Sequence, residues 1–178
     1  GSDTVLKDMR RGNTTKDFID MVHYIKETVP NVTIATDIIV GFPTEDETDF
    51  WQTLEVVRKT TPDVINISRF WPRPGTPAAD MEQVPVDEIK RRTAVLTDIF
   101  HNISRLSHEK WIGWEGSILV TEKGKFENQW IGKNDSYKQV IVEGDFNVGD
   151  VVSVKIVKSG TFDLRGKVIE KEVKVDVY

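Results

Sequence analysis

The stretch T-D-I-I-V-G-F-P-T-E, residues 36–45, decides the fold of the first half of this chain. A short β-branched run ends at Gly41, Pro43 stops it, and Thr44 to Glu47 give an acidic start to a helix. This pattern predicts a buried parallel strand followed by a tight glycine turn. In α/β proteins ligands bind at that edge of the sheet, because loop amides and helix N-termini converge there. An ordinary strand-to-helix turn is the alternative.

Helices and strands alternate on both sides of this stretch. Apolar residues at helical spacing predict helices over 17–28, 47–59 and 86–110, and β-branched runs predict strands over 32–40 and 64–70. This order implies parallel strands joined by right-handed crossovers. Two strands cannot form a closed barrel or a doubly covered sheet. We therefore expect this half to be part of a larger barrel, and its apolar edges to self-associate when it is isolated.

The second half of the chain changes character at Ile112, where the helical repeat gives way to alternation. Short alternating segments separated by turn signals predict strands over 115–121, 128–132, 137–142, 151–157 and 164–169. Five strands in about sixty residues suit a small closed or partly open barrel of OB-like size. We therefore predict an α/β domain over 1–111, an all-β domain over 112–171 and a tail over 172–178.

Composition and charge exclude several classes of protein. The 178 residues carry a net charge of −5, so any RNA contact must come from a local patch rather than from overall attraction. The absence of cysteine excludes disulfides and thiolate metal sites within this chain, and the three histidines are too scattered to predict a metal site. No apolar stretch reaches membrane-spanning length and no signal peptide leads the chain. We therefore expect no membrane partner and a cytoplasmic location.

Three loops fall at the carboxyl ends of the expected parallel strands, over residues 9–14, 41–45 and 68–76. Because parallel strands place these ends at one edge of the sheet, we expect the loops to lie together. They offer an apolar wall, a glycine that permits close approach, and fixed positive charges, which suits a nucleoside-like ligand with a carboxylate. For Arg69 and Arg73 the alternative is a solvated loop charge.

Three motifs in fixed order resemble a known enzyme family. They are G-S-D-T-V-L-K-D-M-R-R-G-N-T (1–14), T-D-I-I-V-G-F-P-T-E (36–45) and I-N-I-S-R-F-W-P-R-P-G-T-P-A-A-D-M-E-Q-V-P (65–85). With the all-β half that follows, they look like the back half of the radical S-adenosylmethionine methylthiotransferases, which end in a TRAM domain. The resemblance runs from Gly1 to Ile169. It implies an α/β half of a TIM-like radical-SAM barrel followed by a small OB-like TRAM barrel, and it implies that Gly1 and Ser2 are native.

The resemblance also implies a chemistry. The family uses S-adenosylmethionine and two [4Fe-4S] clusters held by cysteines to add a methylthio group to an N6-modified adenosine in the tRNA anticodon loop. Since thiolates are absent here, we expect an inactive C-terminal fragment with no catalytic residue and no metal site, completed by the missing N-terminal part of the same polypeptide.

The substrate and the function both have alternatives. The loop over 72–85 favours N6-threonylcarbamoyladenosine over N6-isopentenyladenosine, and a ribosomal-protein aspartate is a third family substrate. A non-enzymatic RNA-binding adaptor with a degenerate α/β half is the alternative function.

The resemblance carries an S-adenosylmethionine site onto residues at the strand ends of the first half. The cofactor-binding candidates are Arg11, Asp37, Ile39, Gly41, Phe42, Asn66, Ser68 and Arg69. Two positions depart from the family pattern: Thr44 replaces a second glycine, and Asn13 stands where an aromatic residue or histidine is common. A structural brace is the alternative role for Asp37.

In the all-β half, several cations lie near two aromatic residues, a pattern typical of proteins that stack a splayed base and hold phosphates. The RNA-facing candidates are Lys123, Lys125, Trp130, Lys133, Tyr137, Lys138, Lys158 and Arg165. The expected partner is tRNA. Solvated surface charge is the alternative for each lysine, and a core position is the alternative for Trp130.

Overall fold

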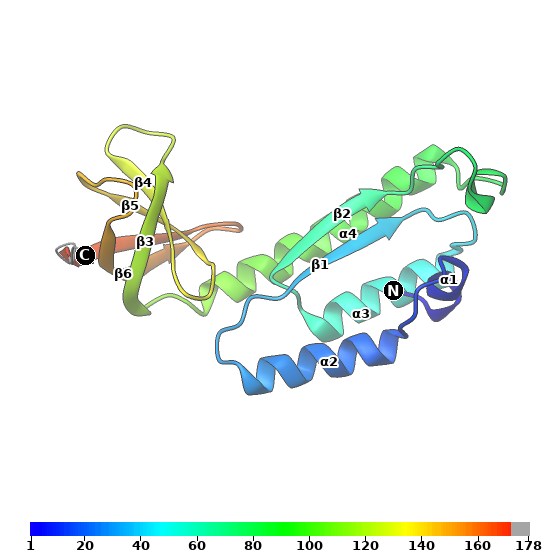
Figure 1. Cartoon of the computed structure of the whole chain (residues 1–178), viewed down its shortest axis with the longest axis horizontal. Coiled ribbons are helices and arrows are strands. Elements are labelled where there is room, and N and C mark those ends of the chain that lie inside the picture. Colours follow the sequence, from blue (N-terminus) through cyan, green and yellow to red (C-terminus); the bar gives the residue numbers. More distant parts are fainter. Residues whose placement is uncertain (172–178) are drawn as a thin grey trace. The chain divides into compact units, whose positions relative to one another are not determined.

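The computed structural model describes residues 1–171, which form two compact units that divide between Ile103 and Ser104. The first unit contains α1 (Asp3–Asp8), α2 (Thr15–Thr28), β1 (Ala35–Val40), α3 (Glu47–Thr60), β2 (Val64–Arg69), the 3-10 turn η1 (Pro77–Ala79) and most of α4 (Val86–Glu109). The second contains the end of α4 with β3 (Glu115–Lys123), β4 (Gln129–Lys133), β5 (Gln139–Glu143), β6 (Val151–Ser159) and β7 (Leu164–Lys171) (Figure 1). The expected helices and strands are all present, and the predicted tail over 172–178 lies outside the described residues.

The short helix α1 was not predicted. Its N-cap is Ser2, whose hydroxyl accepts a hydrogen bond from the amide of Val5 and donates one to Asp49 at the start of α3. Six residues are too few to show an amphipathic repeat, so the cap was the only local signal for this helix.

Helix α4 continues six residues past Ile103, the last residue of the first unit, and so enters the second unit. Its last turns contact the barrel, where Ser104 Oγ donates to the carbonyl of Thr161 at 2.5 Å. This contact agrees with a division of the units at Ser104, whereas the sequence prediction put the domain boundary at residues 111 and 112. None of the helices described in residues 1–171 is both long and apolar enough to cross a bilayer.

In the first unit β1 and β2 form a parallel two-stranded sheet with Ala35 opposite Val64 and Val40 opposite Arg69. One face, which includes Ile38 and Ile65, packs with buried side chains of α3 and α4. The side chains that alternate with them are exposed, so helices cover one face of this sheet within the described residues. The parallel pairing is confirmed, while membership of a larger radical-SAM barrel stays a prediction.

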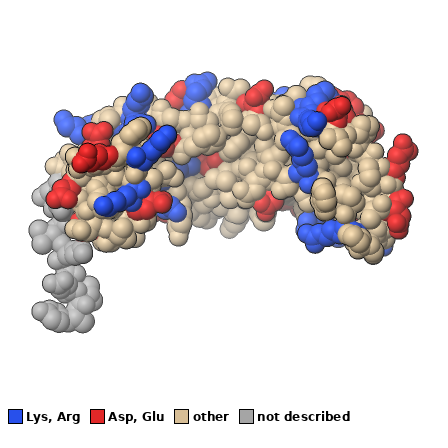
Figure 2. All heavy atoms as spheres, turned by 90° about the horizontal axis from the view of Figure 1, so that it is seen from above, with Lys and Arg blue, Asp and Glu red and all other residues tan. Residues whose placement is uncertain are grey.

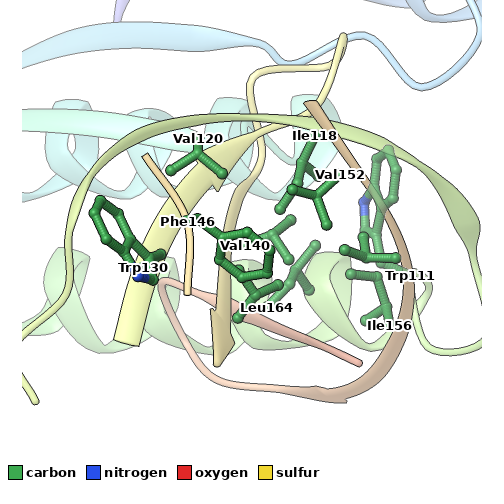
Figure 3. Close-up of a cluster of buried hydrophobic side chains, with 11 residues drawn as sticks. Trp111, Ile118, Val120, Trp130, Val140, Phe146, Val152, Ile156 and Leu164 are labelled. Atoms are coloured by element: carbon green, nitrogen blue, oxygen red, sulfur yellow. The ribbon is translucent and has the colours of Figure 1, made fainter. Parts of the chain in front are cut away.

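The second unit is a closed barrel with strand order β3-β4-β5-β7-β6. Its neighbours are antiparallel except for β5 and β7, which pair in parallel. Apolar side chains from all five strands fill the interior, with Val140 and Leu164 lying between Trp130 and Trp111 in Figure 3. The predicted OB-like barrel is confirmed.

Gly41 directly follows β1, at a turn that Ile89 of α4 approaches closely. Its φ is +84°, in the left-handed region that favours glycine, and a Cβ at this position would lie 2.5 Å from Ile89 Cγ1. The missing side chain therefore admits a helix of the same unit. Packing against α4 is thus a sufficient reason for the glycine, and its predicted contact with a ligand stays a prediction.

We predict that Gly41→Ala destabilises the first unit by about 2–4 kcal/mol, because the new methyl adds a clash with Ile89 to the cost of the left-handed conformation. Gly75→Ala is the matched control, since Gly75 has φ +79° but open space around it, and it should cost about 1 kcal/mol. Urea unfolding of the two variants measures the difference. Equal losses would show that α4 does not require this glycine.

Candidate functional site

The exposed face of the β1–β2 sheet brings together four of the predicted cofactor-binding residues. Asp37 lies opposite Asn66 and Ile39 opposite Ser68 in the strand register. Asn66 Nδ2 donates a hydrogen bond to Asp37 Oδ1 at 2.8 Å, and Ile39 is 36 % exposed. The face therefore joins hydrogen-bonding groups to a patch of apolar surface, as a nucleoside site requires.

A groove of about 400 Å³ runs along the edge of β1 that does not pair with β2. Residues 35–39 line one side, and Arg11 lines it together with Phe18 of α2 and Thr53 of α3. Arg11, Asp37 and Ile39 therefore line the same groove, while loops 41–45 and 68–76 contribute no lining residue to it. Arg69 is exposed at the end of β2 and lies outside the lining of this groove.

Gly41 and Phe42 differ from the other cofactor candidates because both are buried. Phe42 is 4 % exposed and meets the ring of Phe70 edge-on, with the two centroids 5.2 Å apart. These two residues support the turn after β1 from within the unit. Their side chains present no surface to a ligand, and their predicted place in a cofactor site stays a prediction.

A buried ion pair that the sequence analysis missed holds this turn to α4. Glu45 Oε1 accepts hydrogen bonds from the Gly41 amide at 3.1 Å and from Arg92 Nη1 at 2.8 Å, and Arg92 Nη1 also donates to the Glu45 carbonyl at 3.0 Å. The two side chains are 5 % and 6 % exposed. Arg92 Nε donates to Glu88, and the guanidinium lies 5.7 Å from the ring centroid of Phe50.

Both carboxylates of this cluster have shifted pKa values. Burial raises the pKa of Glu45, against the opposing hydrogen bonds from Arg92 and Gly41. Hydrogen bonds from Arg91 and then from Arg92 lower the pKa of Glu88 from 4.5 to about 2. The stabilising contribution of Glu88 is therefore complete above pH 4.5 and is lost as the pH falls through about 2.

The helical spacing of α4 did contain a signal for the pair. Arg92 follows Ile89 by three residues and precedes Leu96 by four, so it lies on the buried stripe of the helix. A charged residue on such a stripe needs a buried partner. Sequence alone does not show that the partner is Glu45.

On the barrel, most of the RNA-facing candidates are exposed. The register places Lys133 opposite Leu119 and Gln139, and it places Arg165 opposite both Ile141 and Lys158. Lys133, Arg165 and Lys158 therefore lie on the outer face on either side of β5. Lys123 and Lys125 are exposed near the β3–β4 hairpin, at the other end of β4.

Trp130 and Lys138 are the two RNA-facing candidates that are buried. Trp130 belongs to the barrel core, as Figure 3 shows, and its Nε1 donates to the Gly144 carbonyl at 3.1 Å. Lys138, which follows the β4–β5 loop, is 5 % exposed. Neither presents an accessible surface to RNA, so the prediction is corrected at both positions and the core alternative holds for Trp130.

The loop between β4 and β5 carries an unusual buried amide. Asn134 Oδ1 accepts a hydrogen bond from the amide of Lys138 at 2.9 Å, while its buried Nδ2 has no hydrogen-bond partner within residues 1–171. A buried donor without a partner costs about 1–3 kcal/mol. Such a group is a candidate for ligand contact.

The second unit matches a known domain family. Residues 112–169 match the TRAM domain. This chain contains a TRAM domain. The closed barrel from β3 into β7 is its fold, and the RNA-facing candidates all lie within the matched residues.

Relatives that match almost the whole chain are named as tRNA methylthiotransferases. The threonylcarbamoyladenosine tRNA methylthiotransferase of Drosophila pseudoobscura pseudoobscura is 40 % identical over 97 % of this chain and 31 % of its own length. The enzyme of that name from Xenopus laevis is 42 % identical over 95 % of this chain and 30 % of its own length. A probable enzyme of this name from Methanocaldococcus jannaschii is 40 % identical over 95 % of this chain and 38 % of its own length.

These relatives confirm the resemblance to the methylthiotransferases that the three motifs predicted, together with the TRAM domain that follows them. The chain spans about a third of the length of these relatives.

We predict that Arg92→Met lowers the free energy of unfolding of the first unit by about 3–5 kcal/mol, because it leaves the Glu45 carboxylate buried without its partner. Arg91→Met is the matched control one residue away: the Arg91 side chain is 47 % exposed, and its loss should cost less than about 1 kcal/mol. Urea unfolding followed by circular dichroism compares them. A small loss in both variants would mean that the pair does not hold the turn.

Proposed function

We propose that this chain is part of a tRNA methylthiotransferase that acts on N6-threonylcarbamoyladenosine in the anticodon loop. The observation that carries the proposal is the 40 % identity to an enzyme of that name over 97 % of this chain. The TRAM domain supports it, because a small barrel of this class suits RNA binding. A non-enzymatic RNA-binding adaptor is the second candidate, because the TRAM barrel by itself suits RNA binding.

The open face of the β1–β2 sheet fits the nucleoside end of S-adenosylmethionine. Ile39 offers apolar surface to a base, and the Asp37–Asn66 pair with Ser68 offers hydrogen-bonding groups around it. Arg11, in the adjoining groove, would attract a carboxylate. When bound, S-adenosylmethionine would supply the methyl group of the product. These residues would hold and orient it.

The residues of this chain do not fit an iron–sulfur cluster. Such clusters are held by thiolates, and the sequence has no cysteine. In this proposal the cluster ligands belong to a further part of the enzyme, and no step through a cluster is assigned to this chain.

Disruption of the gene that encodes this chain should remove the methylthio group from N6-threonylcarbamoyladenosine in the tRNA of the source cells. Mass spectrometry of digested tRNA measures the nucleoside with and without the group, and reintroducing the gene is the control. Unmethylthiolated threonylcarbamoyladenosine should accumulate at the expense of the modified form. Unchanged modification would support the adaptor.

The barrel would bind tRNA through the outer face around β5. Lys133 is exposed on β4 and Arg165 on β7, the two neighbours of that strand, and Lys158 is exposed opposite Arg165 on β6. Figure 2 shows acidic and basic side chains interspersed on the visible face. Modest and salt-sensitive affinity therefore follows from a few local phosphate contacts.

Changing Lys133 and Lys158 together to Glu should weaken tRNA binding about tenfold and reduce the salt slope of log K by about 2, because two phosphate contacts are lost. Lys16→Glu with Lys59→Glu is a control with the same charge change, on exposed positions of α2 and α3. Fluorescence anisotropy at several salt concentrations gives both slopes. An equal drop in the two double variants would point to overall charge rather than to this face.

A further inference from the structure

A groove of about 500 Å³ on the barrel lies between β3 and the loop that joins β4 to β5. Leu119 and Thr121 line it from β3, while Lys133, Asn134 and Tyr137 line it from the end of β4 and the loop. All of these residues belong to the second unit, so the groove is complete within the TRAM domain.

Tyr137 occupies this groove in an unusual state. Its side chain is 74 % exposed although its φ is +61°, a left-handed conformation that is unfavourable for a bulky residue. Asn134 enforces the conformation from two sides: its carbonyl accepts from the Tyr137 amide at 2.8 Å, and its Oδ1 accepts from the Lys138 amide. Because the ring is exposed, burial of apolar surface does not offset the cost of this backbone conformation. We therefore take the exposed position of the ring as the feature that the loop conformation preserves.

The groups around the ring complement one nucleotide. Lys133 Nζ lies 5.3 Å from the Tyr137 ring centroid, so a cation accompanies an exposed aromatic face. A base can stack on such a face, and a phosphate can pair with the ammonium. The Asn134 Nδ2, buried and without a partner in the described residues, is a donor for which a base supplies acceptors.

Resting on the proposed role in tRNA binding, we propose that this groove is a subsite for a single unpaired nucleotide. The base stacks on Tyr137, Lys133 pairs with a phosphate of the nucleotide, and an acceptor atom of the base takes the hydrogen bond from Asn134 Nδ2. Since Nδ2 is closed to solvent here, the loop over 134–138 shifts as the base enters. A base paired in a helix cannot stack in this way, so the subsite selects single-stranded RNA.

The barrel offers a control with the same chemistry outside the groove. Lys125 Nζ lies 5.8 Å from the ring centroid of Phe126, which is 65 % exposed in the β3–β4 hairpin. Neither residue lines the groove. A lysine beside an exposed ring is therefore present at both ends of β4. The groove and Asn134 are present only at the end that carries Tyr137.

The test uses the 178-residue chain and a short single-stranded RNA containing 2-aminopurine, whose fluorescence reports stacking. Tyr137→Ala should weaken binding about tenfold, equivalent to about 1.4 kcal/mol, and abolish the fluorescence change. Tyr137→Phe should retain both signals, because the ring remains. Phe126→Ala should change affinity less than twofold, and a duplex of the same sequence should not respond to Tyr137→Ala.

The role of Asn134 has its own variant. Asn134→Asp with Asp135→Asn keeps the net charge and the acceptor for the Lys138 amide, but it replaces the free donor by an acceptor. It should weaken binding several-fold and change the order of preference among the four bases at the stacked position. An unchanged preference would remove Asn134 from the subsite.

The outcomes separate the two proposals. If the wild-type chain binds tRNA while Tyr137→Ala binds single-stranded RNA as well as wild type does, the subsite is wrong and the RNA-binding role stands. Equal losses in Tyr137→Ala and Phe126→Ala also overturn the subsite, because any exposed ring would then suffice. A wild-type chain without affinity for RNA overturns both, and points to a protein partner for this face.

Discussion

The buried pair of Glu45 and Arg92 is the interaction on which the open edge of the α/β unit depends. One carboxylate oxygen holds both the Gly41 amide and the Arg92 guanidinium, so the turn after β1 and the helix α4 share a single anchor. Ile89 lies against Gly41 from the same helix. The turn is therefore held to α4 through Glu45 and Ile89, and the exposed face of the sheet stays open to a ligand.

The TRAM barrel is stabilised differently. β7 pairs with β5 on one side and β6 on the other, which closes the barrel through a short parallel contact between β5 and β7. Its interior is apolar, and its exposed functional candidates lie on loops and outer faces. A rigid barrel of this kind can hold a strained loop residue such as Tyr137 without losing its core packing.

The sequence predicted what depends on local pattern and missed what depends on distant partners. Alternation and turn residues were sufficient for five barrel strands, and the β-branched runs for the parallel pair. The same alternation could not tell which face of β4 points inward, so Trp130 was assigned to RNA although it fills the core. Local pattern also could not show that Gly41 packs against Ile89, 48 residues later in the chain, because only the fold brings the two together.

The open face of β1 and β2 bears on the choice between enzyme and adaptor. An exposed Ile39 beside the hydrogen-bonded pair of Asp37 and Asn66 adds little to the stability of a two-stranded sheet with one solvated face. An adaptor that binds RNA through its barrel does not need an apolar side chain on this face of the sheet. A polar residue in place of Ile39 would then improve solubility. A ligand with a base and polar substituents does demand this combination. The exposed apolar surface beside ordered polar groups therefore favours the enzyme.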